Sequence, residues 1–565
     1  MKELSQRISQ KDDNTPVRLR KNNNQNQWKN TPKLRINTTK TIEIPIILWY
    51  NQIKNGVLIV QRYEEGKDRS QVQIVNLEDL IDENNPVRVI DAFVDSLNMA
   101  KLGFKYAETK ETGRKPMNPA DMCKLYVYGY YNGIRTSRKL ERECEKNIEV
   151  MWLINNLKPH NKTISEFRRN NKQVLENVFK EFSMLCDALN LIGKEMVAID
   201  GSKFRASNSR KRNYTKNKVK KMIKYFEESA NKYLELLEKN DKDDIDFNEE
   251  NLTEKLKAAQ KRIEELKGMY EDIENNGEIS ITDKDARHMG VSNNGTDIAH
   301  NVQIAVDSEN HLVVAVDVVS NPDDSAQLFN MAKQAAKELG IELKDKEENQ
   351  SEEEYEEYVL TVLADKGYYQ YENLRDCLDS GIKPIVAKEK VSNKTGNEKY
   401  IRDNFIYDKE RDIYICPEGK ILNNVSNPTS QNQLYKNKAA CKECPFKDQC
   451  TTSTEERTIK RNEQHDIYDI VNKIMDENKQ VYKRRQEIVE HVFGTVKRNL
   501  GYTYFLTRGN ESVRAESFMH FLAYNLKRVI KIVGVKALVE AINSYAINIF
   551  SFFYKFNFGK LEMVI

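Results

Sequence analysis

The stretch VQIAVDSENHLVVAVDVVS, residues 302–320, contains two runs of mostly branched apolar side chains separated by the polar segment SENH. Short apolar runs bounded by turn-forming residues are typical of β-strands, so this stretch predicts a β-hairpin. Outward from it, three further runs predict three more strands: EMVAID at 195–200, YVLTVLAD at 358–365 and GIKPIVAKEK at 381–390. These five strands form the centre of the predicted fold.

Helical patterns follow the hairpin at 324–340 and the last strand at 481–501. The resulting order, three strands and then helices alternating with strands, predicts an α/β layered domain. Asp200 and Asp365 each end a predicted strand, at the edge where open sheets place their chemistry, and Glu490 lies in the last helix.

Together these three acids predict a site for hard cations. Mg²⁺ prefers oxygen ligands and keeps positions open for phosphate and water. Two ions about 3.5–4 Å apart can activate the attacking oxygen and stabilise the leaving one in an in-line displacement. A single aspartate at a strand end is often only a turn former, so the prediction depends on all three acids. The sequence has neither a GxxxxGK[ST] loop nor an HExxH motif.

Charge is unevenly distributed along the 565 residues. Lys plus Arg total 90 against 87 Asp plus Glu, yet residues 203–224 contain ten Lys or Arg and no acid. Such a block can bind a polyanion or can be a solvated helix face, and both interpretations stay open. No apolar run is long enough to span a bilayer, and the start lacks the apolar centre of a secretory signal. We therefore expect a cytoplasmic, nucleoid-associated protein without a membrane partner.

Four cysteines, Cys416, Cys441, Cys444 and Cys450, lie within 35 positions. In a cytosolic chain such a cluster favours a metal over disulfides, and four thiolates complete a closed tetrahedral Zn²⁺ site. The alternative is four free thiols. Elsewhere, apolar residues at alternating spacings of four and three over 219–237 and 252–270 predict an antiparallel helical hairpin, either a spacer or a dimerising arm.

Several motifs occur in an order that resembles the DDE transposases of bacterial insertion sequences: AIDGSKFRA (198–206), NVQIAVDSENHLVVAVDVVSNPDDSAQL (301–328), LADKGYY (363–369) and QEIVEHVFGTVKRNLGY (486–502). Upstream segments are similar to the helical N-terminal domain of one branch of that family: NPVRVIDAFVDSL (85–97), GRKPMNPADMCKLYVYGYYNGIRTSRKLERE (113–143) and KTISEFRR (162–169). The resemblance covers about 75–530. It implies a ribonuclease H-like catalytic domain with two Mg²⁺ (or Mn²⁺) ions, which cleaves DNA at transposon ends and joins the 3′-hydroxyl to target DNA.

Composition, periodicity and the resemblance together predict boundaries for the parts of the chain. They are a basic arm with a possible hairpin (1–75), a helical DNA-binding domain (76–190), the first part of the catalytic domain (191–390) with the helical-hairpin insertion (205–295), a cysteine-rich insertion (391–470), the completed catalytic domain (471–535) and a tail (536–565). Within the helical domain, residues 161–189 predict one long helix that Thr163 or Ser165 can cap.

Two residues of the last helix, Glu487 and Glu490, are candidates for the third acid. Lys497 lies seven residues after Glu490, two helical turns, and is expected on nearly the same face; the family has a basic residue at that distance. Family members also carry a Tyr and an Arg before the acid. Here Tyr482 and Arg485 lie one position off that spacing, with Gln486 where the Arg would fall. The resemblance favours Glu490, beside an apolar stripe that is expected to face the sheet and consists of Val489, Val492, Phe493 and Val496.

DNA is the expected partner, as terminal inverted repeats and as target. Helices between 115 and 180 are expected to recognise the element ends, and five cations to contact phosphates: Arg210, Lys211, Arg212, Lys497 and Arg498. Coordinated cutting of two ends implies a homodimer or larger complex, with the 219–270 hairpin as a contact. Two alternatives remain. One is a catalytically silent DNA-binding derivative of a transposase, and the other is a metal-dependent nuclease of another lineage, since the cysteine spacing also resembles an iron–sulfur clasp of RecB-like nucleases.

Overall fold

The computed structural model describes residues 70, 74–108, 115–243, 249–291, 295–344, 358–388, 393–427 and 430–545. Residues Val75–Ile565 form one compact unit, separate from Met1–Ile74. The predicted basic arm, apart from residues 70, 74 and 75, and the tail beyond residue 545 lie outside the described residues. None of the described helices combines the length and the apolar character that a membrane span requires.

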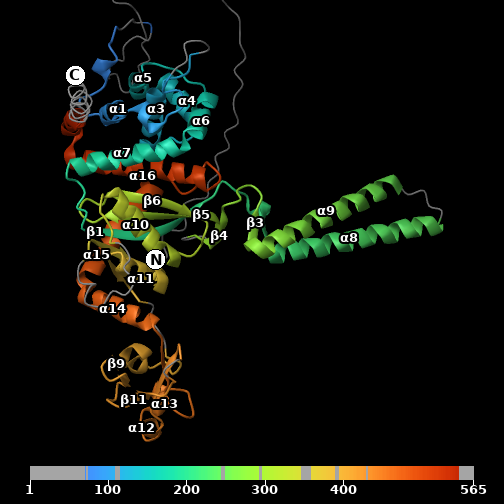
Figure 1. Cartoon of the computed structure of the whole chain (residues 1–565). Helices are drawn as coiled ribbons and strands as arrows, with labels where there is room; N and C mark the ends of the chain where they lie inside the picture. Colours follow the sequence, from blue (N-terminus) through green and yellow to red (C-terminus); the bar gives the residue numbers. More distant parts are fainter. Residues whose placement is uncertain are drawn as a thin grey trace, which may run out of the picture. The chain divides into compact units, whose positions relative to one another are not determined.

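A six-stranded sheet occupies the centre of this unit (Figure 1). Its strands are β1 (Met196–Arg205), β4 (Arg287–Gly290), β5 (Thr296–Asp307), β6 (Val313–Val319), β7 (Leu360–Ala364) and β8 (Ile382–Val386). β5 pairs antiparallel with β1, β4 and β6, whereas β1, β7 and β8 are parallel. The five predicted strands are confirmed, and β4 is an addition that the sequence analysis did not foresee.

Helices cover both faces of the sheet, which explains why its strands are near-continuous apolar runs. The helices concerned are α10 (Leu328–Glu338), α11 (Tyr371–Asp379), α14 (Gln464–Glu477), α15 (Lys479–Gly494) and α16 (Asn510–Val533). α15 packs on β1, β5 and β7, α16 packs on β6, and α14 packs on β8 and α11. The predicted alternation of strands and helices is confirmed.

The N-terminal helices share one hydrophobic core with the sheet. They are α1 (Val87–Asp95), α2 (Met99–Leu102), α3 (Pro119–Tyr131), α4 (Ser137–Lys146), α5 (Ile148–Leu153), α6 (Asn161–Asn170) and α7 (Lys172–Ala188). α3 and α7 pack against α16. Arg135 strengthens this junction because its guanidinium donates to the Tyr504 carbonyl at 2.7 Å and pairs with the buried Glu516 at 3.2 Å.

The prediction of one long helix over 161–189 is wrong. The helix is interrupted at Asn171. The buried side chain of this residue accepts a hydrogen bond from the Lys105 backbone N–H and donates one to the Phe167 carbonyl. These bonds satisfy backbone groups at the break, so two helices replace one. The cap of α6 is His160, which accepts from the Lys162 N–H, and not Thr163 or Ser165.

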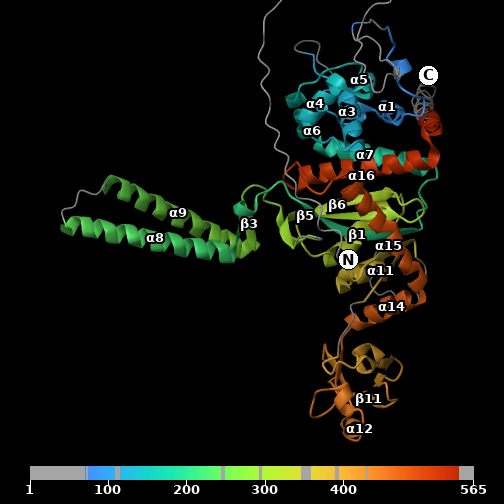
Figure 2. The same cartoon turned by 180° about the vertical axis from the view of Figure 1, so that it is seen from behind.

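The predicted helical hairpin is confirmed: α8 (Lys216–Asp243) and α9 (Glu249–Asn276) lie side by side in both views (Figures 1 and 2). The short strands β2 (Asn213–Thr215) and β3 (Glu278–Ser280) pair at its base. Its buried seam is small and centres on Val219, Leu266 and Ile273. Residues 244–248 of its acidic loop lie outside the described residues.

A second sheet forms a lobe between β8 and α14, which we call the cysteine lobe (residues 393–462). Its elements are β9 (Ile406–Asp408), β10 (Ile413–Ile415), β11 (Ile421–Asn424), β12 (Gln433–Lys436), α12 (Lys438–Lys442), α13 (Lys447–Cys450) and β13 (Ile459–Arg461). The predicted insertion ran to residue 470. In the structure α14 already begins at Gln464 and packs on the main sheet, so the lobe is shorter.

Candidate active site

The register of two parallel strands brings two of the three predicted acids together. β1 and β7 pair with Val197 opposite Val362 and Ala198 opposite Leu363. Continuing this register by two residues places Asp200 beside Asp365, on the same face of the sheet. Asp365 then caps a short 3₁₀ turn, because its Oδ1 accepts the Gly367 N–H at 2.8 Å. The prediction that Asp365 follows its strand is confirmed, but the prediction that Asp200 ends one is wrong, because β1 continues to Arg205 through its pairing with β5.

Asp200 is mostly buried and lies near two other carboxylates and one guanidinium. Burial, together with the neighbouring Asp365 and Asp324, raises the pKa of its carboxyl to about 6. The Arg485 guanidinium, 4.0 Å from the Asp200 carboxylate, and the Gly201 backbone N–H oppose that shift. A carboxylate that burial and like charge disfavour is one that a bound cation stabilises strongly.

Arg485 was absent from the predicted site, although its spacing had been noted. Its side chain is only 12% exposed, and its Nε is buried with no hydrogen-bond partner among the described residues. The family spacing pointed one position further, to Gln486, which is exposed here. The sequence did contain a signal for Arg485, because it is a basic residue on the side of α15 that faces the sheet.

A buried polar network lies directly beside Asp200 and was not predicted. Asp324 accepts hydrogen bonds from Lys203 at 2.8 Å, from Asn301 at 2.6 Å and from Gln303 at 2.7 Å. Asn301 and Gln303 are fully buried in β5. Two amides at alternate positions of an otherwise apolar strand were the signal, since buried polar groups require partners.

Gly201 lets this network approach β1. A Cβ on residue 201 would lie 2.2 Å from Gln303 Nε2 and 2.8 Å from Asp324 Oδ1. Both distances are below van der Waals contact, so only glycine fits between Asp200 and the network without a shift. The glycine of the AIDGS segment is therefore required by packing, not by backbone conformation.

Contacts at its two ends show that α15 runs alongside β1 in the same direction. Near its start, Arg484 donates to the Ser308 carbonyl at 3.4 Å, and Ser308 itself bonds to Met196 at the start of β1. Beyond its end, Lys497 donates to Ser202 Oγ at 2.6 Å and to the Lys203 carbonyl at 2.8 Å. Thirteen helical residues and six strand residues both span about 20 Å, so the two ends match.

Glu490 lies between these two contacts along α15 and is exposed. Glu487 lies one turn earlier and interacts electrostatically with His311, which follows β5. The apolar stripe predicted to face the sheet is buried, as expected. The described residues nevertheless contain no group of three or more His, Cys, Asp or Glu side chains placed closely enough to hold a metal ion.

The expectation that Glu490 and Lys497 share one face of a regular helix is wrong. Residues Thr495–Asn499 form a π-helix, whose wider turn changes the phase between the two side chains. Lys497 turns onto β1 and lies over the Phe204 ring at 4.3 Å, whereas Glu490 is exposed. Burial and the nearby Lys203 lower the pKa of Lys497 to about 8, although Asp200 opposes the shift.

The basic block divides into engaged and exposed cations. Lys203 pairs with Asp324, Lys216 pairs with Glu274 of α9 at 2.9 Å, and Lys218 donates to two backbone carbonyls. Lys211 and Arg212 are exposed, as is Arg498, while the Arg210 side chain lies outside the described residues. Although residues 203–224 contain no acid, their cations still find acidic partners, because Glu274 of α9 pairs with Lys216.

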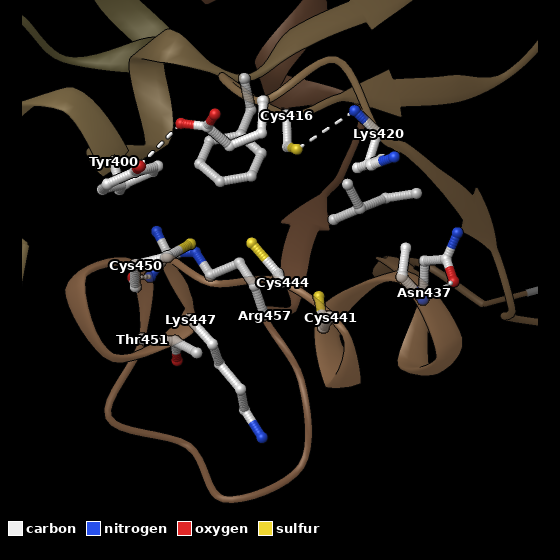
Figure 3. Close-up of a pocket in the computed structure, with 14 residues that line it drawn as sticks. Tyr400, Cys416, Lys420, Asn437, Cys441, Cys444, Lys447, Cys450, Thr451 and Arg457 are labelled. Atoms are coloured by element: carbon white, nitrogen blue, oxygen red, sulfur yellow. Dashed lines mark hydrogen bonds between the residues drawn. The ribbon is translucent and has the colours of Figure 1, made fainter.

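The four predicted zinc ligands line one small cavity in the cysteine lobe (Figure 3). Cys416 follows β10, Cys441 lies in α12, Cys444 lies between α12 and α13, and Cys450 ends α13. All four are free thiols. The sequence therefore identified a set of residues that the fold brings together.

Two separate parts of the chain match models of protein families. The model described as "Transposase domain (DUF772)" matches residues 75–170, and the model described as "Transposase DDE domain" matches residues 415–530. Both matched parts are similar to transposases. Together the matches support a DDE transposase, for which a divalent metal is the general requirement. Glu490 and the four lobe cysteines lie inside the second match, whereas Asp200 and Asp365 lie outside both.

No curated protein matches this chain. A solved structure described as "Cryo-EM structure of piggyBac transposase synaptic complex with hairpin DNA" aligns with 82% of this chain and 79% of that chain, at 9% identity and a TM-score of 0.29. A TM-score this low supports no conclusion about fold or substrate.

Proposed function

We propose that this chain is a DNA transposase of a bacterial insertion sequence, which binds the terminal inverted repeats, cleaves at the element ends and joins the 3′-hydroxyl to target DNA. The observation that carries the proposal is the β1–β7 register, because its continuation sets Asp200 beside Asp365. Glu490 is proposed as the third acid because α15, which contains it, packs on β1 and β7. The strand order β6-β5-β1-β7-β8, antiparallel and then parallel, supports a ribonuclease H-like catalytic domain.

Both proposed reactions are phosphoryl transfers in which the protein supplies position and charge. Asp200, Asp365 and Glu490 would hold two Mg²⁺ (or Mn²⁺) ions, which activate the attacking oxygen and stabilise the leaving oxygen. The first nucleophile is water, which breaks the end phosphodiester and frees a 3′-hydroxyl; that hydroxyl then attacks target DNA. No covalent protein–DNA intermediate is needed.

Other residues of the site would act on position and charge. Asp324, held by Lys203, fixes Gln303 against Gly201 and thereby fixes β1 at the carboxylates. Arg485 offsets the negative charge of Asp200 in the absence of a cation. Lys497, held on β1 beside Asp200, is placed to contact a phosphate of the bound strand.

A strand-transfer assay with the element's own terminal repeats, in Mg²⁺ and in EDTA, tests the catalytic proposal. Asp200→Asn, Asp365→Asn and Glu490→Gln should each lower cleavage and joining by more than about 100-fold, beyond the loss usual for outer-shell partners of metal ligands. DNA binding, measured by fluorescence anisotropy, should persist. Glu487→Gln is the matched control, because it removes an exposed carboxylate one turn away.

Three results would contradict parts of this proposal. Loss of joining in Glu487→Gln with near-normal joining in Glu490→Gln would make the third acid wrong. A wild-type chain that binds the repeats but never cuts would be a silent DNA-binding derivative. Cutting that ignores the repeats and yields no joined product would indicate a nuclease of another lineage.

The DNA contacts are also part of the proposal. Helices between residues 115 and 180, namely α3 to α6 and the first half of α7, are proposed to recognise the element ends. Exposed Lys211, Arg212 and Arg498 are proposed to contact phosphates, together with Arg210 and Lys497. Lys211 and Arg212 lie directly before the base of the α8–α9 hairpin. Counterion release on phosphate binding predicts a steep loss of affinity with salt.

The α8–α9 hairpin is proposed as a contact between two copies of the chain on DNA. Its own seam buries few side chains, while Tyr225, Leu234 and Leu236 on α8 remain exposed. Deleting residues 225–268 should reduce pairing of two ends, measured by native gel mobility, and should reduce joining with it. Intact end pairing and joining in the deletion variant would refute this contact.

A further inference from the structure

We propose that Cys416, Cys441, Cys444 and Cys450 bind one structural Zn²⁺ ion that holds the cysteine lobe together. This site is distinct from the proposed catalytic carboxylates and takes no part in their chemistry. Four thiolates would close the coordination sphere and leave no position for substrate.

Convergence of the four side chains is the first support. They belong to separate segments of the lobe, yet all line one cavity of about 30 Å³. Figure 3 shows the Cys416 sulfur entering from one side and those of Cys441, Cys444 and Cys450 from the other. A cavity of this size has room for a single ion and not for a multi-iron cluster.

The turn after Cys416 is the second support. Cys416 Sγ accepts the Lys420 backbone N–H at 3.3 Å, and the Gly419 N–H donates to the Cys416 carbonyl at 2.8 Å. Gly419 has φ +71°, a conformation that favours glycine and lets the chain fold back on the sulfur. A backbone N–H aimed at sulfur stabilises thiolate charge, as ligands of a cation require.

Charge around the cavity is the third support. Arg457 lines it, and the sulfurs of the other three cysteines act electrostatically on Cys450. Four thiolates around one Zn²⁺ ion would leave a net negative charge, and Arg457 would offset part of it.

The small core of the lobe is the fourth support and gives the ion its role. Five side chains form its buried cluster: Phe405, Tyr414, Leu422, Tyr435 and Ile459. Domains below about 70–80 residues rarely gain enough stability from such a core alone and commonly need a metal or disulfides. Cys416 and Cys450 pack against this cluster, so an ion there would tie β10 to α13.

As placed, no three potential ligands among the described residues are close enough to hold an ion, so binding must draw the thiolates inward. The segments that would move are short: the turn at Cys416, the five-residue α12 and the four-residue α13. None of these belongs to the main sheet, so the movement leaves the proposed active site in place.

Metal analysis of the full chain, purified without chelator, tests the proposal. We expect one equivalent of zinc per chain, lost in Cys416→Ser and Cys444→Ser but kept in Cys377→Ser, the matched control with a buried thiol outside the lobe. Less than half an equivalent of zinc without iron, iron in place of zinc, or equal zinc in all three variants would overturn it.

A second measurement covers the case in which the serine variants fail to fold. Wild-type chain stripped of metal is titrated with Co²⁺, and the visible spectrum is followed. The d–d and sulfur-to-cobalt bands of a tetrahedral tetrathiolate site, displaced by one equivalent of Zn²⁺, would support the proposal. A spectrum of octahedral, oxygen-ligated cobalt alone would overturn it. Neither readout depends on strand transfer, so this proposal and the proposed function can fail independently.

Discussion

The central sheet and the cysteine lobe are both β-sheets, but they reach stability by different means. The sheet shares one large apolar core with helices on both faces, and its polar network around Asp324 is internally satisfied. The lobe has five short strands, five buried side chains in its cluster and four thiols around one cavity. If both proposals hold, this chain would use cations in two ways: carboxylates on a well-packed sheet would hold them for chemistry, and thiols in a sheet with a small core would hold one for structure.

Removal of tightly bound metal should show this contrast most strongly. A chelator that strips Zn²⁺ should unfold the lobe, because its small core cannot hold it, while the sheet stays folded. Hydrogen exchange measured by mass spectrometry should rise many-fold in residues 393–462 and stay low in β1, β5 and β7. Equal loss of protection in both regions would contradict the claim that only the lobe depends on a metal for its stability.

Acidity should affect the sheet through Asp200. Its folded pKa of about 6 is above its unfolded value, so the protonated form favours folding, and stability falls as pH rises from about 4 to about 6. The loss is on the order of 3 kcal/mol in buffer without Mg²⁺. Urea unfolding at several pH values should show this fall in wild type and a flatter profile in Asp200→Asn. Identical profiles would mean that Asp200 titrates normally.

Substitution of Gly201 tests the packing of the polar network. Gly201→Ala should destabilise the sheet by about 1–3 kcal/mol, because its Cβ collides with the Gln303 amide and Asp324. Gly290→Ala in β4 is the control, since its Cβ would meet nothing within 4 Å. Thermal unfolding of both variants checks the prediction. Equal unfolding midpoints would contradict it, because they would show that Gln303 and Asp324 can move aside without loss of stability.

The smallest expected effect concerns surface charge. Replacing Arg210, Lys211 and Arg212 with Ala should flatten the salt dependence of DNA affinity by about one logarithmic unit of slope per lost phosphate contact. The control variant replaces Lys255, Lys257 and Lys261 of α9 with Ala. These three lysines are also exposed, so the control loses the same net charge. Fluorescence anisotropy between low and moderate salt measures the slope. An unchanged slope in the first variant would assign its three residues to a solvated surface.

Periodicity was enough to predict the main strands and the helical hairpin of this protein. Apolar runs identified the five main strands, alternating spacings identified the helical hairpin, and Asp200 and Asp365 were found because each ends a run. The four cysteines were recognisable from spacing alone. These features depend on neighbours within a few residues, which is the range that a sequence pattern encodes.

Only the tertiary structure decided which distant polar groups meet. The pairing of Lys203 with Asp324 joins residues 121 positions apart, and the approach of Arg485 to Asp200 depends on how α15 lies along β1. The break at Asn171 is stabilised by a bond to Lys105, and the π-turn that moves Lys497 onto β1 has no periodic signature. Hydrogen bonds and charge pairs of this kind form only after packing has brought the elements together, because their energy depends on burial that no local segment supplies.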